Sequence, residues 1–490
     1  MLQVLAACRS TKRKIGWAAL VSLAVVSCLL LHRSGIAPED YDHVEGTQSC
    51  VGVCGGVPCG NWIAKDPARI TCSKLQQLWG CNCSLGGAAG FADRVPPIQH
   101  RPKPPLITFS AEQFPLARCL DGSMAGFYWR QGVEPKHLIF FEGGGWCYGA
   151  DSEHKPATSN RIRQDCWKRS RYRLGSSTSW ERGLRKSWMT GYLSEDPKEN
   201  KVFSRWTLIY VPYCDGVGFA GNRSMYGLHF RGQAIREAVI QQAIKMGIRS
   251  SQMVVLSGGS AGAALVLQKA DMMAEELRLY HGRVLALPDA GFFVDIPDKS
   301  GKRLWQNNLK FLYEQTHACS NLHSSCVQLN PRDPCSCLFP ENYVDFVKTP
   351  TFLVQSLYDY GTAWFTLGLL CCPGDLCKGW PTCRGADMRM FHALRTTHMH
   401  RWAQFVRNAG NGIWAISCME HTLAWSHFSS SAWKVARGGR GYTMAQAVLQ
   451  WLRYHEGNHS VESDRSQNST LVWEDKAWPH NPGCAYQRLS

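Results

Sequence analysis

Ser260 stands in the sequence setting that a serine nucleophile requires. The apolar run Met253–Ser257 predicts a buried strand, the pentapeptide Gly258–Gly262 follows it at once, and helical spacing of apolar residues begins at Ala263. A glycine-flanked serine between a strand and a helix is typical of a nucleophile elbow, a tight turn that projects the hydroxyl above the sheet edge. The alternative is a glycine-rich turn whose serine only caps the helix.

A second glycine cluster, Gly143–Gly145, follows the predicted strand Leu138–Phe141. Consecutive glycines after an early strand expose backbone N–H groups, which in hydrolases stabilise the negative charge of a tetrahedral intermediate. The N–H of the residue after the nucleophile, here Ala261, would complete such an oxyanion hole. A phosphate-binding loop is the alternative, but the Gly-Lys-Ser/Thr ending of such loops is missing here.

A serine nucleophile needs a histidine base, which in this fold class follows an orienting acid along the chain. His421 comes just after a strong terminal strand, in the segment Ser417–His421, and is the preferred candidate. His427 is its close competitor. The other late histidines lie in a predicted helix, where solvated histidines are ordinary: His392, His398 and His400.

Two aspartates follow predicted strands and could orient the base. Asp359 follows Thr351–Gln355, and Asp289 follows Val284–Leu287. Chain position favours Asp359, whereas a buried structural carboxylate is the simpler interpretation of Asp289.

The elements that must position these residues indicate an α/β fold. Most strand candidates are continuous apolar or β-branched runs, as expected for parallel strands covered on both faces. Helical stretches at Ala234–Met246 and Ala263–Leu277 alternate with them. We therefore expect an α/β-hydrolase-like, mostly parallel sheet with helices on both faces and disulfide-rich insertions. The strand candidates are Leu138–Phe141, Thr207–Val211, Met253–Ser257, Val284–Leu287, Thr351–Gln355 and Ile413–Ser417.

The first residues predict membrane targeting. A basic cluster at residues 9–14 precedes the uncharged apolar run Ile15–Leu31. This run is at the short limit for a spanning helix, which needs about 20 residues. Because no clean small-x-small cleavage site follows it, a signal anchor with its positive flank in the cytoplasm is preferred to a cleaved signal peptide.

Cysteine usage favours the secretory pathway. Of 22 cysteines, only Cys8 and Cys28 lie in or before the apolar run, and the remaining twenty predict disulfides formed in an oxidising lumen. Four glycosylation sequons agree with that compartment: Asn82, Asn222, Asn458 and Asn468.

Composition shifts divide the chain into four parts. We expect an anchor or signal peptide at 1–33, a cysteine-rich module with a proline-rich linker at 34–105, a catalytic domain at 106–457 and a polar tail at 458–490. Six closely spaced cysteines predict a small module held by disulfides, and a zinc knuckle is the weaker alternative. These cysteines are Cys50, Cys54, Cys59, Cys72, Cys81 and Cys83. Two further cysteine-dense segments, 319–337 and 371–383, predict stapled insertions.

The net charge bears on which classes of molecule the protein could bind. The chain carries a formal net charge of +16, and 44% of its residues are hydrophobic. Its basic residues are scattered and accompany no RNA or DNA motif, so nucleic-acid binding is not expected. A basic surface suits an acidic polymer or the anionic face of a membrane.

Several motifs in order show that the chain resembles the pectin acetylesterase and Notum carboxylesterase family. The resemblance covers about residues 119–427. Its carriers are Cys119–Ser123, Glu142–Cys147, Tyr213–Gly216, His229–Gln233, Gly258–Gly262, Asp289–Phe293 and Ser417–His421.

The resemblance implies the roles of individual residues. The family's catalytic serine matches Ser260, its acid Asp359 and its histidine His421, while Asp289 falls in a segment matched to a pocket wall. The family's oxyanion donors match Gly144, Gly145, Trp146 and Ala261. The mechanism implied is acyl transfer to water without a metal or organic cofactor.

The family leaves two substrate classes open: acetylated polysaccharides, and secreted proteins that carry a long acyl chain. The segments Gly143–Cys147 and His229–Gln233 look more like the polysaccharide branch, so O-deacetylation of a polysaccharide is preferred. A membrane-tethered, non-catalytic glycan-binding protein is the alternative from another class. The N-terminal module and the two cysteine-rich insertions depart from the family core and could alter access to the site.

Overall fold

The computed structural model describes residues 50–54, 57–58, 82–85, 102–148, 155–369, 371, 383–408, 410–457 and 471–478. The chain divides into a unit of residues 1–49 and a unit of residues 50–490, and all described residues belong to the second. The expected anchor therefore lies outside the described residues. Within them, no helix has both the length and the apolar character needed to cross a membrane.

A nine-stranded sheet is the centre of the fold, with strand order β16-β13-β12-β11-β10-β6-β7-β5-β4. The strands from β7 to β16 in that order run parallel, and β5 and β4 add an antiparallel edge. The fold class expected from the sequence is thus confirmed. The strands are β4 (Leu106–Thr108), β5 (Gly126–Arg130), β6 (Lys136–Phe141), β7 (Thr207–Val211), β10 (Met253–Gly259), β11 (Arg283–Asp289), β12 (Phe352–Ser356), β13 (Gly412–Ile416) and β16 (Leu471–Glu474).

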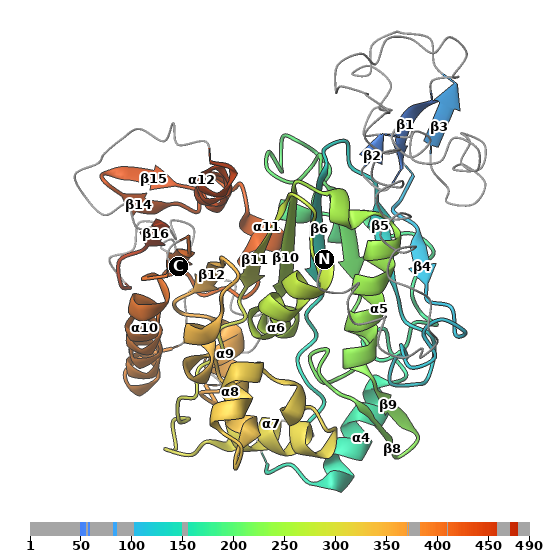
Figure 1. Cartoon of the computed structure of the whole chain (residues 1–490). Helices are drawn as coiled ribbons and strands as arrows, with labels where there is room; N and C mark the ends of the chain where they lie inside the picture. The colour runs from blue at the N-terminus through green and yellow to red at the C-terminus, as the bar shows by residue number, and fades with distance from the viewer. Residues whose placement is uncertain are drawn as a thin grey trace, which may run out of the picture. The chain divides into compact units, whose positions relative to one another are not determined.

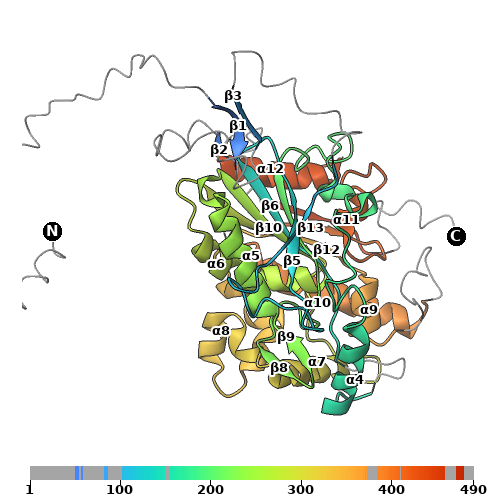
Figure 2. The same ribbon diagram turned by 90° about the vertical axis from the view of Figure 1, so that its right-hand side faces the viewer.

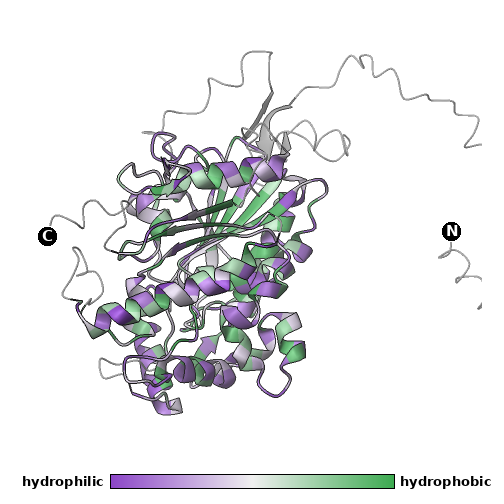
Figure 3. Cartoon of the chain, turned by 90° about the vertical axis from the view of Figure 1, so that its left-hand side faces the viewer, coloured by the Kyte–Doolittle hydropathy of each residue, from purple (hydrophilic) through white to green (hydrophobic). Residues whose placement is uncertain are grey.

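The central strands are apolar throughout because each supplies two hydrophobic cores. In β10, Val254 and Leu256 belong to one core, whereas Met253 and Val255 belong to the other. Successive side chains of a strand point to opposite faces, so a strand covered on both faces has no polar side. Figure 3 shows these hydrophobic strands between helices whose outer sides are hydrophilic.

Helices cover both faces of the sheet. On one face, α5 and α6 pack with the core that contains Val254, and on the other α11 and α12 pack with the core that contains Val255 (Figures 1 and 2). The helices are α4 (Ser159–Arg169), α5 (Gly232–Lys245), α6 (Ala261–Leu277), α7 (Leu304–Gln315), α8 (Ser324–Leu329), α9 (Tyr360–Phe365), α10 (Ala386–Phe405), α11 (Leu423–His427) and α12 (Met444–Glu456).

Small antiparallel sheets complete the described structure. One hairpin joins β8 (Arg223–Met225) to β9 (Leu228–Phe230), and another joins β14 (Val435–Arg437) to β15 (Arg440–Tyr442). In the cysteine-rich module, three strands pair in the order β2-β1-β3: β1 (Cys50–Cys54), β2 (Val57–Pro58) and β3 (Asn82–Leu85). The side chains of this module, and with them its expected disulfides or zinc site, lie outside what the structure describes.

All six strands expected from the sequence are present, with ends shifted by at most two residues. Three strands were not predicted, namely β4, β5 and β16, and two of them, β4 and β16, form the edges of the sheet. Residues 471–474 fell within the expected polar tail, yet they pair with β13 through the register Trp414 to Trp473. An edge strand buries little of its own surface, so its sequence carries only a weak strand signal.

The expected insertions are stapled by disulfides. Three bonds lie in the two cysteine-dense segments: Cys319–Cys335, Cys326–Cys337 and Cys371–Cys383. Two more bonds tie the sheet's loops, Cys119–Cys214 and Cys147–Cys166. Because disulfides persist in oxidising compartments, these bonds agree with the secretory pathway.

Candidate active site

Ser260 lies at the turn between β10 and α6, as the elbow pattern predicts. Its backbone has φ 53° and ψ −120°, a conformation that costs free energy for a residue with a side chain. The carbonyl of Ser260 accepts a hydrogen bond from the Ala264 N–H at 2.9 Å and so starts the helix. Its side chain makes no capping hydrogen bond, which argues against the simpler helix-cap interpretation.

The glycine loop after β6 reaches the serine. A Cβ added at Gly143 would lie 2.5 Å from the Gly259 oxygen and 2.9 Å from the Ser260 Cβ. Only a residue without a side chain permits this approach. Directly after Ser260, Ala261 occupies the first turn of α6, where backbone N–H groups have no partner within the helix. The glycine loop and the start of α6 therefore both adjoin Ser260.

Tyr213 shapes the glycine loop from the neighbouring strand end. Its ring lies so close to Gly144 that an added Cβ would be 2.4 Å from the ring. The Tyr213 hydroxyl donates to the Gly145 carbonyl at 2.5 Å and accepts from the Gly218 N–H at 2.9 Å. The Arg169 guanidinium also donates a hydrogen bond to the Gly144 carbonyl. Two carbonyl oxygens of the loop are therefore held, one by Tyr213 and one by Arg169.

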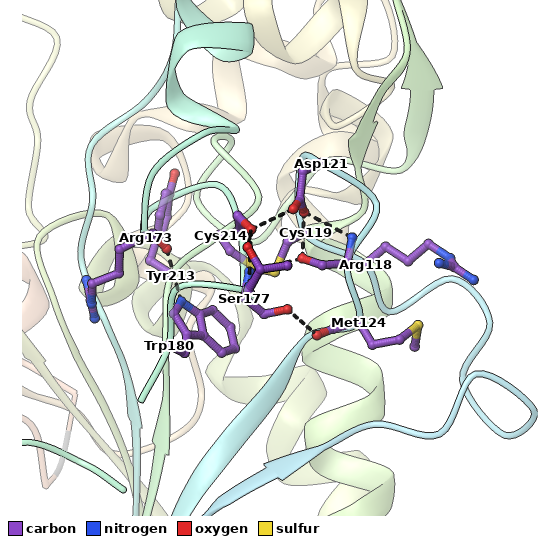
Figure 4. Close-up of a disulfide and its surroundings, with 12 residues drawn as sticks. Arg118, Cys119, Asp121, Met124, Arg173, Ser177, Trp180, Tyr213 and Cys214 are labelled. Carbon is purple, nitrogen blue, oxygen red and sulfur yellow. Dashed lines mark hydrogen bonds between the residues drawn. A yellow bond between two sulfur atoms is a disulfide. The ribbon is translucent and has the colours of Figure 1, made fainter. Parts of the chain in front are cut away.

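A buried ion pair fixes the start of the loop. The Glu142 carboxylate accepts hydrogen bonds from the Arg173 guanidinium at 2.5 and 2.6 Å and from the Tyr213 N–H at 3.0 Å. Figure 4 shows Arg173, Tyr213 and Trp180 near the Cys119–Cys214 disulfide, where the Trp180 indole donates to the Arg173 carbonyl at 3.0 Å. The disulfide holds the residue that follows Tyr213, so covalent and ionic contacts support the loop together.

His421 and Asp359 lie together in the structure. The ring Nδ1 of His421 is 2.8 Å from Oδ2 and 3.0 Å from Oδ1 of Asp359. Asp359 is fully buried and also accepts hydrogen bonds from the Thr362 N–H at 2.7 Å and the Gln355 amide at 3.1 Å. Because these donors fix the carboxylate, it can hold the imidazole in one orientation and one tautomer.

The electrostatics favour a basic His421. Burial alone lowers the pKa of His421, but the adjacent Asp359 charge and hydrogen bond, with smaller contributions from Asp289 and Glu420, raise the pKa above its usual value. The side chain is 12% exposed, so its ring still reaches the surface of the site.

Asp289 is a buried carboxylate that binds backbone N–H groups, in line with the simpler of the two interpretations of its sequence position. Its carboxylate accepts the Leu423 N–H at 3.0 Å and the Ala424 N–H at 2.7 Å, at the start of α11. Its backbone oxygen accepts the Ser260 N–H at 2.9 Å. Burial raises the pKa of Asp289 to about 7, against the effect of these hydrogen bonds. Asp289 thus contacts backbone on both sides of the site.

The other candidate histidines contact different groups. His427 stacks on Trp433 with the ring centroids 3.8 Å apart, and His392 bonds to the Tyr358 hydroxyl at 3.0 Å. His398 lies in α10 as expected but is fully buried rather than solvated, and burial lowers its pKa to about 4. Among the five candidates, only His421 has a hydrogen bond to one of the two candidate acids within the described residues.

A small, mostly apolar cavity of about 30 Å³ lies near the start of α6. Trp146 and Phe293 line it with their rings 5.4 Å apart, and the Phe293 ring is 6.3 Å from that of His421. Ala264, one helical turn after Ser260, lines it as well. In the part of the chain that the structure describes, no group of three or more histidine, cysteine or acidic side chains could hold a metal ion.

Two features of this site could not be found from the sequence. The contacts of Glu142 with Arg173 and with Tyr213 span 31 and 71 positions along the chain, so no local pattern predicts them. The contact between Asp289 and the start of α11 spans 134 positions. The sequence signal for them was that Glu142, Tyr213 and Asp289 each lie in a motif shared with the family.

The parallel sheet, the strained serine after β10 and the adjacent glycine loop define an α/β-hydrolase-like protein. The model of the pectinacetylesterase family matches residues 102–485, and the chain belongs to this family. It is therefore a hydrolase that acts on carboxylic esters.

Individual relatives fall in two groups. Pectin acetylesterase 5 and pectin acetylesterase 4 of Arabidopsis thaliana are each 28% identical to this chain; the matches cover 68% and 80% of this chain and 77% and 93% of those proteins. The palmitoleoyl-protein carboxylesterase NOTUM of Homo sapiens is 31% identical over 75% of this chain and 70% of its own length. The resemblance noted in the sequence is thus confirmed.

Proposed function

We propose that the chain is a serine esterase in which Ser260 is the nucleophile, His421 the base and Asp359 the residue that orients it. The Ser260 hydroxyl loses its proton to Nε2 of His421 as its oxygen attacks the ester carbonyl. The histidine then returns this proton to the leaving alcohol, and an acyl-enzyme remains. A water activated by the same histidine hydrolyses it. The observation that carries the proposal is the Asp359–His421 pair at 2.8 Å, which accompanies the positive φ of Ser260 at the turn between β10 and α6.

The oxyanion of the tetrahedral intermediate would be stabilised by backbone N–H groups of Gly144, Gly145, Trp146 and Ala261. The hydrogen bonds to the glycine loop support this assignment, because Tyr213 and Arg169 hold two carbonyl groups of the loop. A fixed donor needs no reorganisation when charge develops, and losing one donor of this kind costs about 10²- to 10³-fold in kcat.

For the substrate we propose an O-acetylated polysaccharide. Two plant relatives are pectin acetylesterases by name, and the match to one of them covers 93% of its length. The cavity beside the site is small, with a volume of about 30 Å³. That space suits an acetyl methyl group better than the long chain of a palmitoleoyl ester, the substrate named for the NOTUM relative.

Hydrolysis of p-nitrophenyl acetate by the purified luminal part tests the activity. We expect turnover and covalent labelling by a fluorophosphonate probe, both abolished in Ser260→Ala. Ser257→Ala is the matched control, because the Ser257 hydroxyl donates to the Leu287 carbonyl at 2.6 Å and is fully buried. If the wild type neither turns over nor labels, the chain is not an esterase, and a glycan-binding role would replace this proposal.

We also propose that residues 15–31 anchor the protein in a membrane of the secretory pathway, with the cysteine-rich module at 34–105, the catalytic domain at 106–457 and a tail at 458–490 on the luminal side. The disulfides of the described residues are consistent with that side. Alkaline carbonate extraction of expressing cells tests the anchor. We expect the full chain to stay in the membrane pellet, and its release as a soluble protein would contradict the anchor.

A further inference from the structure

The cavity beside the candidate nucleophile extends along α6, whose residues Ala264, Leu265, Gln268 and Lys269 line it. Its near walls are Trp146, Phe293 and Ala264, which belong to or adjoin the site. At the far end lie Gln268 and Lys269, which follow Ser260 by two to three turns of α6. These two side chains therefore determine how deep a group bound next to Ser260 can extend.

The same two side chains also line a much larger groove. This groove has a volume of about 770 Å³ and lies along α6 and the segments before β11 and β12, where Asp271 and Lys348 line it. Of all the residues that line the small cavity, only Gln268 and Lys269 line the groove as well, within the described part of the chain. They form the partition between the two spaces.

Hydrogen bonds hold the partition in place. The Lys269 ammonium donates to the Leu322 carbonyl at 2.8 Å, and the side chain is buried, with 6% of the residue exposed. The Gln268 amide donates to the Cys337 carbonyl, and its oxygen accepts the His323 N–H at 2.8 Å. Moving either side chain would leave buried polar groups unpaired, which is costly.

The partners of these bonds belong to the stapled insertion. Leu322 and His323 lie within the loop that the Cys319–Cys335 disulfide closes, and Cys337 is bonded to Cys326. Leu322 also lines the cavity, as do Leu338 and Phe339, which follow the insertion. A segment held by disulfides thus fixes Gln268 and Lys269 in place. A longer substrate would have to displace these side chains against that constraint.

We propose that Lys269, supported by Gln268, is a specificity-determining residue that limits the acyl group to acetyl or a similarly short chain. This inference rests on the proposed esterase activity of Ser260, because the cavity has meaning as an acyl site only if an acyl-enzyme forms there. The stem of Lys269 blocks the path of an acyl chain from the cavity toward the groove. Removing the stem joins a space of about 30 Å³ to one of about 770 Å³.

The test compares p-nitrophenyl acetate with p-nitrophenyl octanoate in the full-length wild type and in full-length Lys269→Ala. In the wild type we expect kcat/KM to favour acetate at least tenfold. In Lys269→Ala the ratio of kcat/KM for octanoate to kcat/KM for acetate should rise at least tenfold. Lys269→Val is a second truncation for use if the alanine variant does not fold.

Two controls separate size from charge. Lys269→Met keeps the length of the side chain without the ammonium and should keep the wild-type preference. Lys348→Ala removes a lysine that lines only the groove and should leave the ratio unchanged. An equal rise in Lys269→Met would overturn the steric wall.

The outcomes also separate this inference from the activity on which it rests. A wild type that hydrolyses neither ester overturns the esterase proposal. A wild type that hydrolyses acetate and octanoate equally, or truncated variants that fold and keep the wild-type ratio, overturns the wall alone.

Discussion

The backbone oxygen of Asp289 accepts a hydrogen bond from the Ser260 N–H at 2.9 Å, while the carboxylate of the same residue caps the start of α11. Three non-glycine residues with positive φ surround this contact: Ser260 at 53°, Ala290 at 58° and Thr422 at 58°. Such conformations cost free energy and persist only where the surroundings hold them. Asp289 therefore links the elbow that carries Ser260 to the loop that carries His421.

We expect Asp289→Asn to lower kcat for p-nitrophenyl acetate by tenfold or more with little change in KM. The two N–H groups bind different carboxylate oxygens of Asp289, and the NH2 group of an asparagine cannot accept a hydrogen bond. The loop before Leu423 should therefore shift and displace His421. Steady-state kinetics on the folded variant checks this expectation.

Asp271→Asn provides the matched control for Asp289. Asp271 also accepts two backbone N–H groups, from Lys348 at 3.0 Å and Thr349 at 2.7 Å, but it lines the groove and not the cavity beside the site. Both variants should lose stability, whereas only Asp289→Asn should lose kcat. Equal kcat in the two variants would mean that Asp289 supports the fold and not the base.

The pH dependence of the reaction should report the raised pKa of His421. Only the neutral imidazole can accept the serine proton, so activity should fall as the pH drops through this pKa, which lies above the usual 6.5. In Asp359→Asn the main cause of the upward shift is gone and burial remains. We therefore expect the acidic limb of the kcat/KM profile to move to lower pH and kcat to fall by about 10⁴-fold.

A pH titration of both proteins under identical salt conditions tests that shift. Glu420→Gln is the control, because Glu420 contributes least of the acidic groups that raise the pKa of His421. Glu420→Gln should move the acidic limb of the kcat/KM profile to lower pH, by less than Asp359→Asn does. A limb that stays in place or moves upward in Asp359→Asn would rule out the proposed pair.

Gly144→Ala should reduce activity far more than it reduces stability. The new methyl group would lie 2.4 Å from the Tyr213 ring, so the loop must move away from the ring that positions it. We expect kcat to fall at least 100-fold, because the donors of the oxyanion hole would move with the loop. Gly441→Ala, which meets only the flexible Lys434 side chain at 3.3 Å, should leave kcat unchanged.

Loss of the Cys147–Cys166 disulfide should destabilise the protein and weaken catalysis. The bond joins the end of the glycine loop to α4 across 19 positions. A closed loop of about this length is worth about 3 kcal/mol of unfolding free energy. In a variant with both cysteines changed to serine, the urea midpoint should fall and kcat should drop severalfold.

The Cys371–Cys383 bond offers a comparison for that variant, since it closes a loop of similar size in the second insertion. Its removal should lower the urea midpoint and leave kcat within twofold. If both pairs change kcat alike, the Cys147–Cys166 bond has no special role in holding the glycine loop.

Much of the sheet was predictable because its signal is local. The run Thr207–Val211 predicts β7 with the bounds that the structure shows, since a strand buried on both faces must be apolar at every position. Strand β16 was not predictable in this way. Its four residues form a strand by pairing with β13, which lies more than fifty positions away in the chain.

The sequence by itself determined that Ser260 sits in an elbow, because a tight turn with a close helix leaves its glycines at fixed spacing. It also narrowed the acid to Asp359 or Asp289 and the base to a few histidines. Only the tertiary structure placed Asp359 against His421 and Asp289 against the backbone of α11. Those contacts span 62 and 135 positions and arise from the order of the strands in the sheet. The partition at Lys269 likewise depends on three-dimensional packing, because a cavity is a property of side chains from distant segments and no local pattern encodes its volume.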